Sequence, residues 1–289
     1  METSALEQRY VRLLELVRTN FSPTTQQLVD EALKYADEAL AEERRYDGSP
    51  MLDHAVRTAE IVISEIGLGR NSTVATLLHD VVRLAAKRGA EDLERVTGDL
   101  RAKFGDYVAD ITRALANISD VKTKVAKEQA ENFRDLIVSY STDPRVILIK
   151  LADRLEVMRS LAIFPAAKHH KKSWESLNIY APIAHKLGLY AIKSELEDIS
   201  LSYLEPDDYQ HILSKLEETS QERQQLIARF LEPVIPKLDK MGYEYHIKSR
   251  TKSIFSIWTK MRKSHIPFEE VFDIFALRII VDCPREIEK

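Results

Sequence analysis

The chain has 289 residues, of which only 8 are Gly and 10 are Pro, and its formal net charge is −4. It is long enough to bury one large core or two smaller ones, its composition favours helices, and its interspersed charges give no reason to expect nucleic acid as a partner. The single cysteine, Cys283, excludes an internal disulfide framework, and the absence of a signal peptide or a membrane-spanning apolar run predicts a cytoplasmic protein without membrane contact.

The first part of the chain is predicted to be helical. Apolar residues at helical spacing predict helices over 4–20, 22–40 and 55–66. Gly67 and Gly69 are expected to end the third helix, and Asn71 and Ser72 are expected to cap the next one. A more polar helical stretch follows over 85–120, with breaks expected near its glycines, Gly89, Gly98 and Gly105.

The second part is predicted to change from helices to mixed structure. Helices are expected over 122–141, 145–164, 173–187, 191–204 and 209–230. The chain then alternates like a strand over 243–248, returns to a helix over 254–262 and ends with a β-branched run over 275–281, which predicts a buried strand. One helix and two strands do not make a stable sheet domain, so we expect a fragment of a longer protein.

Four ionisable residues stand out in these apolar helices. His79 and Asp80 are adjacent in one helix, Asp153 lies inside another, and His54 follows a turn. Such groups are costly to bury unless they are paired or bound to a cation, and their nitrogen and oxygen atoms suit Mn, Fe or Zn. From residue types alone, a metal site and a set of hydrogen-bonded core residues are about equally supported.

Longer motifs surround these four residues. The chain resembles the HD superfamily of metal-dependent phosphohydrolases and, more narrowly, the RelA/SpoT homologues, which make and break the alarmone (p)ppGpp of the stringent response. The segments that carry the resemblance are 46–50 with the following His54, 77–82, 129–134, 145–155, 179–188 and 195–198.

The resemblance implies a mainly α protein. It implies a helical HD-domain phosphohydrolase fold over 1–200, a connecting helical region over 201–240, and over 241–289 the beginning of an α/β nucleotidyltransferase-like synthetase domain. The implied partners are guanosine nucleotides (ppGpp, GDP and GTP), the synthetase domain of the same chain and, for a longer protein, the ribosome.

The resemblance also implies roles for single residues. His54, His79, Asp80 and Asp153 match Mn²⁺ ligands, and Asp80 is in addition a catalytic candidate. Arg45 matches a basic residue that packs near the guanine base. Ser160, which stands where the family usually has Thr, keeps a hydroxyl for nucleotide binding.

The synthetase end carries a second set of matches. Arg250, Lys252, Ser256 and Lys260 match residues that face nucleotide phosphates, and Asp273 matches a Mg²⁺ carboxylate. Without the resemblance, a solvated basic face is the simpler interpretation. We expect that residues 1–289 alone do not transfer pyrophosphate from ATP to GTP or GDP, because the match ends before the family's second catalytic carboxylate.

The hydrolase pattern is interrupted at two places. Active hydrolases of the family continue His-Asp-Val-Val with Glu-Asp, whereas this chain has Arg83 and Leu84, and a family His-Asn pair is replaced by Glu156 and Val157. Acid–base catalysis contributes roughly 10²- to 10⁴-fold, and arginine cannot supply it because it stays protonated. The sequence therefore predicts an inactive or very weak hydrolase site with a regulatory role over the synthetase.

Arg83 leaves two hypotheses about the metal. It follows Asp80 by three residues, so its guanidinium is predicted to reach that carboxylate. Either the ligands keep Mn²⁺ while hydrolysis is lost, which we favour, or Arg83 neutralises the carboxylates and excludes the metal. Two alternatives stay open: an active (p)ppGpp 3′-pyrophosphohydrolase that uses Glu156 as a substitute acid, and a non-enzymatic helical scaffold.

Overall fold

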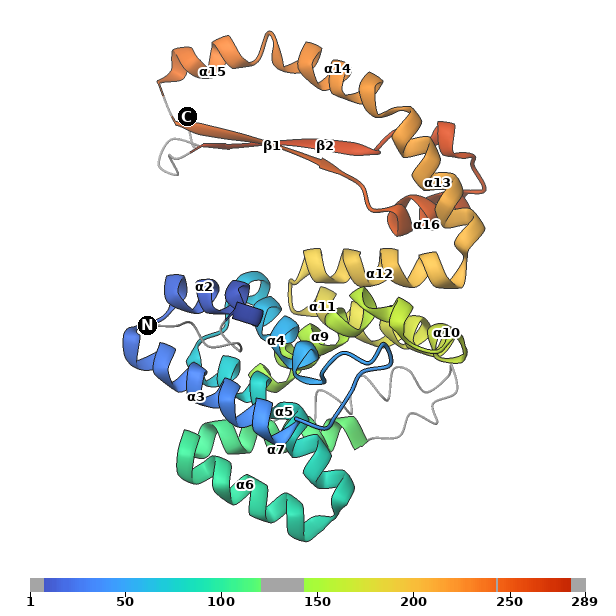
Figure 1. Ribbon diagram of the computed structural model, residues 1–289. Coiled ribbons are helices and arrows are strands. Elements are labelled where there is room, and N and C mark those ends of the chain that lie inside the picture. The colour runs from blue at the N-terminus through green and yellow to red at the C-terminus, as the bar shows by residue number, and fades with distance from the viewer. Residues whose placement is uncertain (1–7, 121–142, 243, 282–289) are drawn as a thin grey trace. The chain divides into compact units, whose positions relative to one another are not determined.

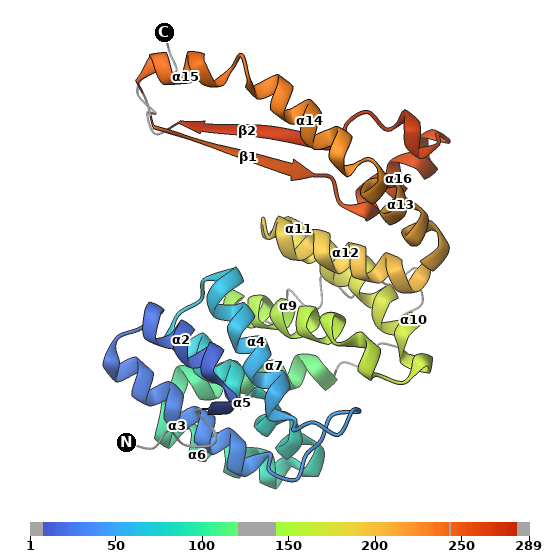
Figure 2. The same cartoon turned by 45° about the horizontal axis from the view of Figure 1, so that its top comes forward.

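The computed structural model describes residues 8–120, 143–242 and 244–281. The chain divides into two compact units, Met1–Ser200 and Leu201–Lys289, both drawn in Figures 1 and 2. The helix expected over 122–141, the motif segment 129–134 and Cys283 lie outside the described residues. Among the residues that are described, no helix is both long and apolar enough to cross a bilayer.

The first unit is helical and is organised around one central helix. This helix, α5 (Arg70–Arg88), contacts α3 (Pro23–Ala39), α4 (Leu52–Ile61), α6 (Ala90–Phe104), α7 (Asp106–Asp120) and α9 (Pro144–Arg159). Every residue of α5 from Ser72 to Val82 is buried, as expected for a helix that is apolar on all sides. In both ribbon views α9 lies alongside α4, which brings their polar residues together beside α5 (Figures 1 and 2).

The remaining elements of this unit complete the helical stack. Gly67, with φ of 77°, ends the π-helical turn that continues α4, because a left-handed residue at this position favours glycine. The elements are α2 (Val11–Asn20), η1 (Val62–Ile66), η3 (Leu161–Ile163), α10 (Ala166–Glu175), η4 (Ser176–Tyr180), α11 (Ala181–Lys186) and α12 (Tyr190–Leu204), whose last residues belong to the second unit.

Two predictions about helix ends are wrong. Asn71 and Ser72 do not cap α5, because the helix already begins at Arg70 and Gly69 is its N-cap residue. Gly98 does not break the chain but lies inside α6. An interior glycine costs only about 1 kcal/mol, and packing of the buried residues on either side, Thr97 and Leu100, offsets that cost.

The second unit combines helices with a two-stranded antiparallel sheet. Its strands pair from Tyr245 opposite Val281 to Thr251 opposite Phe275. The helix expected over 209–230 is divided at Thr219. The elements are α13 (Pro206–Glu218), α14 (Ser220–Leu231), α15 (Ile235–Met241), β1 (Tyr245–Thr251), α16 (Ile254–Ser264), η5 (Phe268–Glu270) and β2 (Phe275–Val281).

The prediction that β2 is a buried strand is wrong. Ile279, Ile280 and Val281 have exposed fractions of 36%, 37% and 41%. The buried cluster of this unit is formed instead by α13, α16 and neighbouring segments, with Leu201, Ile212, Leu216, Ile254, Ile257, Phe268 and Val271 as its members. A β-branched run reports strand propensity, but burial depends on what packs against the strand.

Candidate metal and nucleotide site

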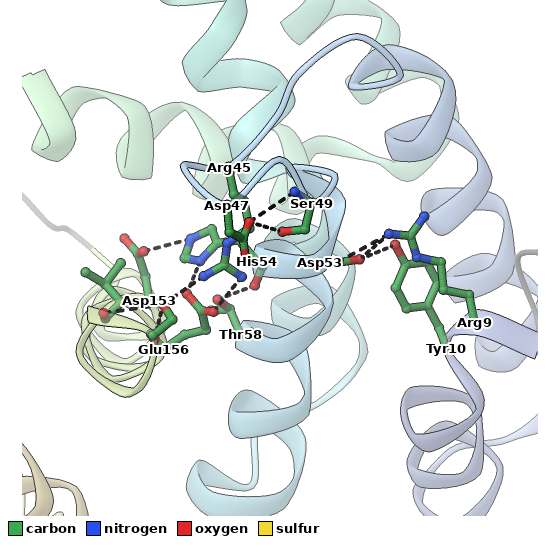
Figure 3. Close-up of polar contacts among 12 residues, drawn as sticks. Arg9, Tyr10, Arg45, Asp47, Ser49, Asp53, His54, Thr58, Asp153 and Glu156 are labelled. Atoms are coloured by element: carbon green, nitrogen blue, oxygen red, sulfur yellow. Dashed lines mark hydrogen bonds and ion pairs between the residues drawn. The ribbon is translucent and has the colours of Figure 1, made fainter. Parts of the chain in front are cut away.

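The segment before α4 positions the first residues of the site (Figure 3). Arg45 lies in a tight turn in which its backbone N–H donates to the carbonyl oxygen of Ser49 at 2.8 Å. The start of α4 is held by Asp53, whose carboxylate accepts a hydrogen bond of 2.8 Å from the Tyr10 hydroxyl. The turn and this anchor together direct Arg45 and His54 toward α9 (Figure 3).

Three helices bring a metal-type donor set together. His54 from α4, His79 from α5 and Asp153 from α9 each offer one ligand atom, and these atoms lie within 4.8 Å of one another. All three residues are buried. His79 Nδ1 contacts the carbonyl oxygen of Thr76 at 2.6 Å, an arrangement that assigns the proton to Nδ1 and leaves the Nε2 lone pair for a ligand. The set fits a divalent metal because His79 Nε2 is buried without a hydrogen-bond partner among the described residues.

His54 bridges two carboxylates. Its Nε2 lies 3.0 Å from Asp153 Oδ1, and its Nδ1 contacts Glu156 Oε2. Burial alone would lower the pKa of His54, but the hydrogen bonds to Asp153 and Glu156 outweigh burial and raise its pKa to about 10. The proton on His54 Nε2 therefore lies between this nitrogen and Asp153, at the place that a metal ion would occupy. A metal ion that binds there is expected to displace this proton.

Asp153 and His79 differ in charge. Burial raises the pKa of Asp153, but Lys150 and His54 outweigh that effect and hold the pKa well below its usual value. The Lys150 ammonium lies 2.6 Å from Asp153 Oδ2. Burial lowers the pKa of His79, which keeps its imidazole neutral and able to bind a metal.

Asp80 does not belong to the three-residue donor group. Its Oδ1 lies 2.6 Å from Arg83 Nη2, so the predicted reach of Arg83 is confirmed. Burial raises the pKa of Asp80, but nearby positive charge, chiefly the guanidinium of Arg83, outweighs burial and lowers the pKa overall. Asp80 Oδ2 is buried and accepts no hydrogen bond from the described residues. A role for Asp80 as a fourth metal ligand therefore stays a prediction, because the guanidinium of Arg83 competes with a metal ion for the Asp80 carboxylate.

Glu156 joins the two ends of the site. One of its oxygens contacts His54 Nδ1, and the other lies 2.9 Å from Arg45 Nη1. Arg45 also donates from Nη2 to Ser160 Oγ at 2.7 Å. Burial raises the pKa of Glu156, but the hydrogen bond from His54 and the charge of Arg45 outweigh burial and keep it ionised. The sequence indicates Glu156 as a substitute acid, whereas its contacts with a histidine and an arginine depend on the packing of α9 against α4 and the turn before it.

A cavity of about 440 Å³ opens beside His54. Two of its lining residues, Lys87 and Lys172, were not singled out from the sequence. Lys87 follows Arg83 by four residues, which places both on one face of α5, and that spacing could have identified it. The cavity is lined by Glu43, Arg44, Arg45, Tyr46, Met51, His54, Arg83, Lys87, Val157, Ile163, Phe164 and Lys172.

The predicted synthetase residues also meet in the second unit. Arg250, Lys252, Ser256 and Asp273 line a cavity of about 230 Å³. Lys252 Nζ and Lys260 Nζ donate to the two oxygens of Asp273 at 2.7 and 2.5 Å. These hydrogen bonds lower the pKa of Asp273 below its usual value. The structure brings this set together, and the assigned phosphate and Mg²⁺ roles stay predictions.

Two known protein families match parts of the chain. The HD domain family matches residues 32–190, a range that contains all of His54, His79, Asp80 and Asp153. The chain belongs to the HD-domain family. Residues 249–289 match the region found in RelA/SpoT proteins. The RelA/SpoT resemblance and the mainly helical HD-domain fold are thus confirmed.

Relatives with 32–36% identity match most of the chain. The guanosine-3′,5′-bis(diphosphate) 3′-pyrophosphohydrolase of Aquifex aeolicus is 36% identical over 259 residues, which are 89% of this chain and 36% of the relative. The GTP pyrophosphokinase of Streptomyces coelicolor is 33% identical over 95% of this chain and 32% of the relative. The bifunctional (p)ppGpp synthase/hydrolase SpoT of Escherichia coli is 32% identical over 93% of this chain and 37% of the relative. The chain therefore spans about a third of the length of these relatives.

Proposed function

We propose that this chain is part of a RelA/SpoT-type protein of (p)ppGpp metabolism whose HD-domain site binds guanosine polyphosphates and regulates the synthetase region, with hydrolysis lost or very slow. The observation that carries the proposal is the ion pair of 2.6 Å between Arg83 and Asp80. A fixed guanidinium occupies a carboxylate oxygen where the family pattern supplies acids to handle the attacking water. Such a site can hold nucleotide but lacks the groups that move a proton.

The residues that would hold a divalent metal, Mn²⁺ by the family pattern, are His54, His79 and Asp153, with Asp80 Oδ2 as a possible fourth donor. A bound metal would polarise a phosphate oxygen and lower the pKa of a water. Glu156 supports this assignment because a carboxylate on the far nitrogen of a metal-binding histidine fixes the orientation of its ring. At the base end, the guanidinium of Arg45 is held by Glu156 and Ser160 beside the cavity.

The position of Glu156 argues against the substitute-acid alternative. Both of its oxygens are engaged, one by His54 Nδ1 and one by Arg45. Glu156 contacts the Nδ1 side of the His54 ring, whereas the Nε2 side faces Asp153. Glu156 is therefore placed to position the histidine and not to pass a proton to a leaving group.

A hydrolysis assay tests the proposal. Wild-type chain is expected to show little or no ppGpp hydrolysis with or without Mn²⁺, and the double variant Arg83→Glu, Leu84→Asp is expected to gain turnover. Acid–base groups contribute roughly 10²- to 10⁴-fold, and only part of this should return because Val157 also departs from the pattern. Arg88→Glu, an exposed change near the end of the same helix, is the control and should gain nothing.

Other outcomes favour the alternatives. Efficient Mn²⁺-dependent hydrolysis by the wild type would contradict the proposal, and loss of turnover in a folded Glu156→Gln that keeps stoichiometric Mn²⁺ would then support Glu156 as the acid. A melting temperature unchanged by ppGpp would support the scaffold alternative, because a ligand of the native state stabilises that state. A cytoplasmic location, control of a neighbouring synthetase and a ribosomal partner remain part of the proposal for the longer protein.

A further inference from the structure

The cavity beside His54 carries a surplus of positive charge. Five of its lining residues are arginines or lysines, and Glu43 is the one carboxylate among the lining residues that the structure describes. The cations are Arg44, Arg45, Arg83, Lys87 and Lys172. Two of them have carboxylate partners, Arg45 with Glu156 and Arg83 with Asp80. A concave surface with this imbalance attracts anions.

Arg44, Lys87 and Lys172 carry the surplus, and Arg44 is held by hydrogen bonds from its Nη1 to the carbonyl oxygens of Ala41 and Glu43. Within the described part of the chain, neither Lys87 nor Lys172 has a carboxylate at ion-pair distance. Lys172 is partly buried, with its Nζ 4.6 Å from the centroid of the Phe164 ring. Burial and the nearby charge of Arg154 lower the pKa of Lys172 to about 8. An unpaired ammonium in this environment is stabilised when an anion binds beside it.

Arg83 extends the same cationic wall. Its side chain is 32% exposed while it contacts the buried Asp80, so its guanidinium faces both the carboxylate and the cavity. Lys87 lies one helical turn further along α5 on the same face. In phosphate sites of this kind, charge neutralisation is usually shared between side chains and a metal ion.

We propose that Arg83, Lys87 and Lys172 form a binding site for the phosphates of a guanosine polyphosphate and that this binding does not require a divalent metal. The inference rests on the proposed function. It adds that positively charged side chains, in place of a metal ion, neutralise the phosphates of the bound nucleotide. The aromatic pair Tyr46 and Phe164, with ring centroids 5.1 Å apart, lines the same cavity and offers a surface for a base. The occupant is thus a nucleotide polyphosphate, and inorganic pyrophosphate alone should bind more weakly.

Calorimetric titration with ppGpp tests the inference. We expect wild-type binding in EDTA with a Kd within about threefold of the value in Mn²⁺, and weaker binding of pyrophosphate. Lys87→Gln and Lys172→Gln should each weaken ppGpp binding by at least about tenfold, because each removes one charge-assisted hydrogen bond. Lys172→Arg keeps the charge and should keep binding. Lys34→Gln, an exposed lysine of α3, should have no effect.

The outcomes separate the inference from the function it rests on. Binding that requires Mn²⁺, or that is unchanged in both lysine-to-glutamine variants, overturns the inference and leaves the proposed function standing. No ppGpp binding with or without Mn²⁺ overturns the proposed function together with the inference. Hydrolysis measured in the same Mn²⁺ samples tests only the proposed function, because the EDTA titration is read without turnover.

Discussion

The contact between Glu156 and Arg45 gives the sharpest test of the site's architecture. Their side chains are 3% and 5% exposed, and their closest atoms are 2.9 Å apart. Glu156→Gln keeps the volume, so no cavity forms, but it removes the negative charge that contacts both Arg45 and the protonated His54, and it leaves Arg45 with Ser160 as its remaining side-chain partner among the described contacts. Removing one member of a buried ion pair costs about 3–5 kcal/mol, and we expect a loss in the free energy of unfolding near the lower value because Gln can still accept one hydrogen bond.

Urea unfolding at pH 7 in EDTA measures this loss. The two tryptophans lie in different units, Trp174 in the first and Trp258 in the second, so a Trp258→Phe background lets Trp174 fluorescence follow the first unit alone. The matched control is Glu195→Gln, which removes the same charge from a half-exposed pair with Arg159.

The control should change the free energy of unfolding by less than about 1 kcal/mol, because the pair is solvated and Arg159 keeps Glu65 as a partner. If Glu156→Gln costs no more than Glu195→Gln, the buried contacts of Glu156 with Arg45 and His54 do not exist in solution and the assignment of Glu156 as a positioning residue is wrong.

Three further predictions follow from other parts of the first unit. Gly98→Ala should raise the free energy of unfolding by about 0.5–1 kcal/mol, because Gly98 lies inside a helix and has open space around it. Gly67→Ala should lower the free energy of unfolding by about 1 kcal/mol or more, because Gly67 has a φ of 77°. A urea titration that gives both changes the same sign would contradict the helix assignments. Because the pKa of Lys172 is lowered to about 8, its charge is present below that pH and lost above it. The affinity for ppGpp should therefore fall more steeply between about pH 7 and 9 in the wild type than in Lys172→Arg, and equal profiles would exclude Lys172 from the site. His79→Gln should abolish stoichiometric Mn²⁺ in elemental analysis while the exposed His170→Gln retains it, and metal retained by both would place the ion elsewhere.

Some of the site was predictable because its determinants are local. Arg83 reaches Asp80 since residues three apart share a helix face, and Gly67 ends its helix because of its own backbone freedom. The motifs around His54 and His79 identified the family without any knowledge of distances. The buried strand at β2 was predicted wrongly because propensity is local while burial is set by neighbours.

The sequence by itself determined the helical class and the family, and it predicted the loss of the acids that follow Asp80 in the family pattern. Only the tertiary structure decided that Glu156, 102 residues from His54, orients that histidine while it holds Arg45, and that Lys172 from α10 joins Arg83 of α5 on one cavity. The physical reason is that spacing along a helix sets which neighbours share a face, whereas contacts between helices depend on how the buried faces of α4, α5 and α9 pack.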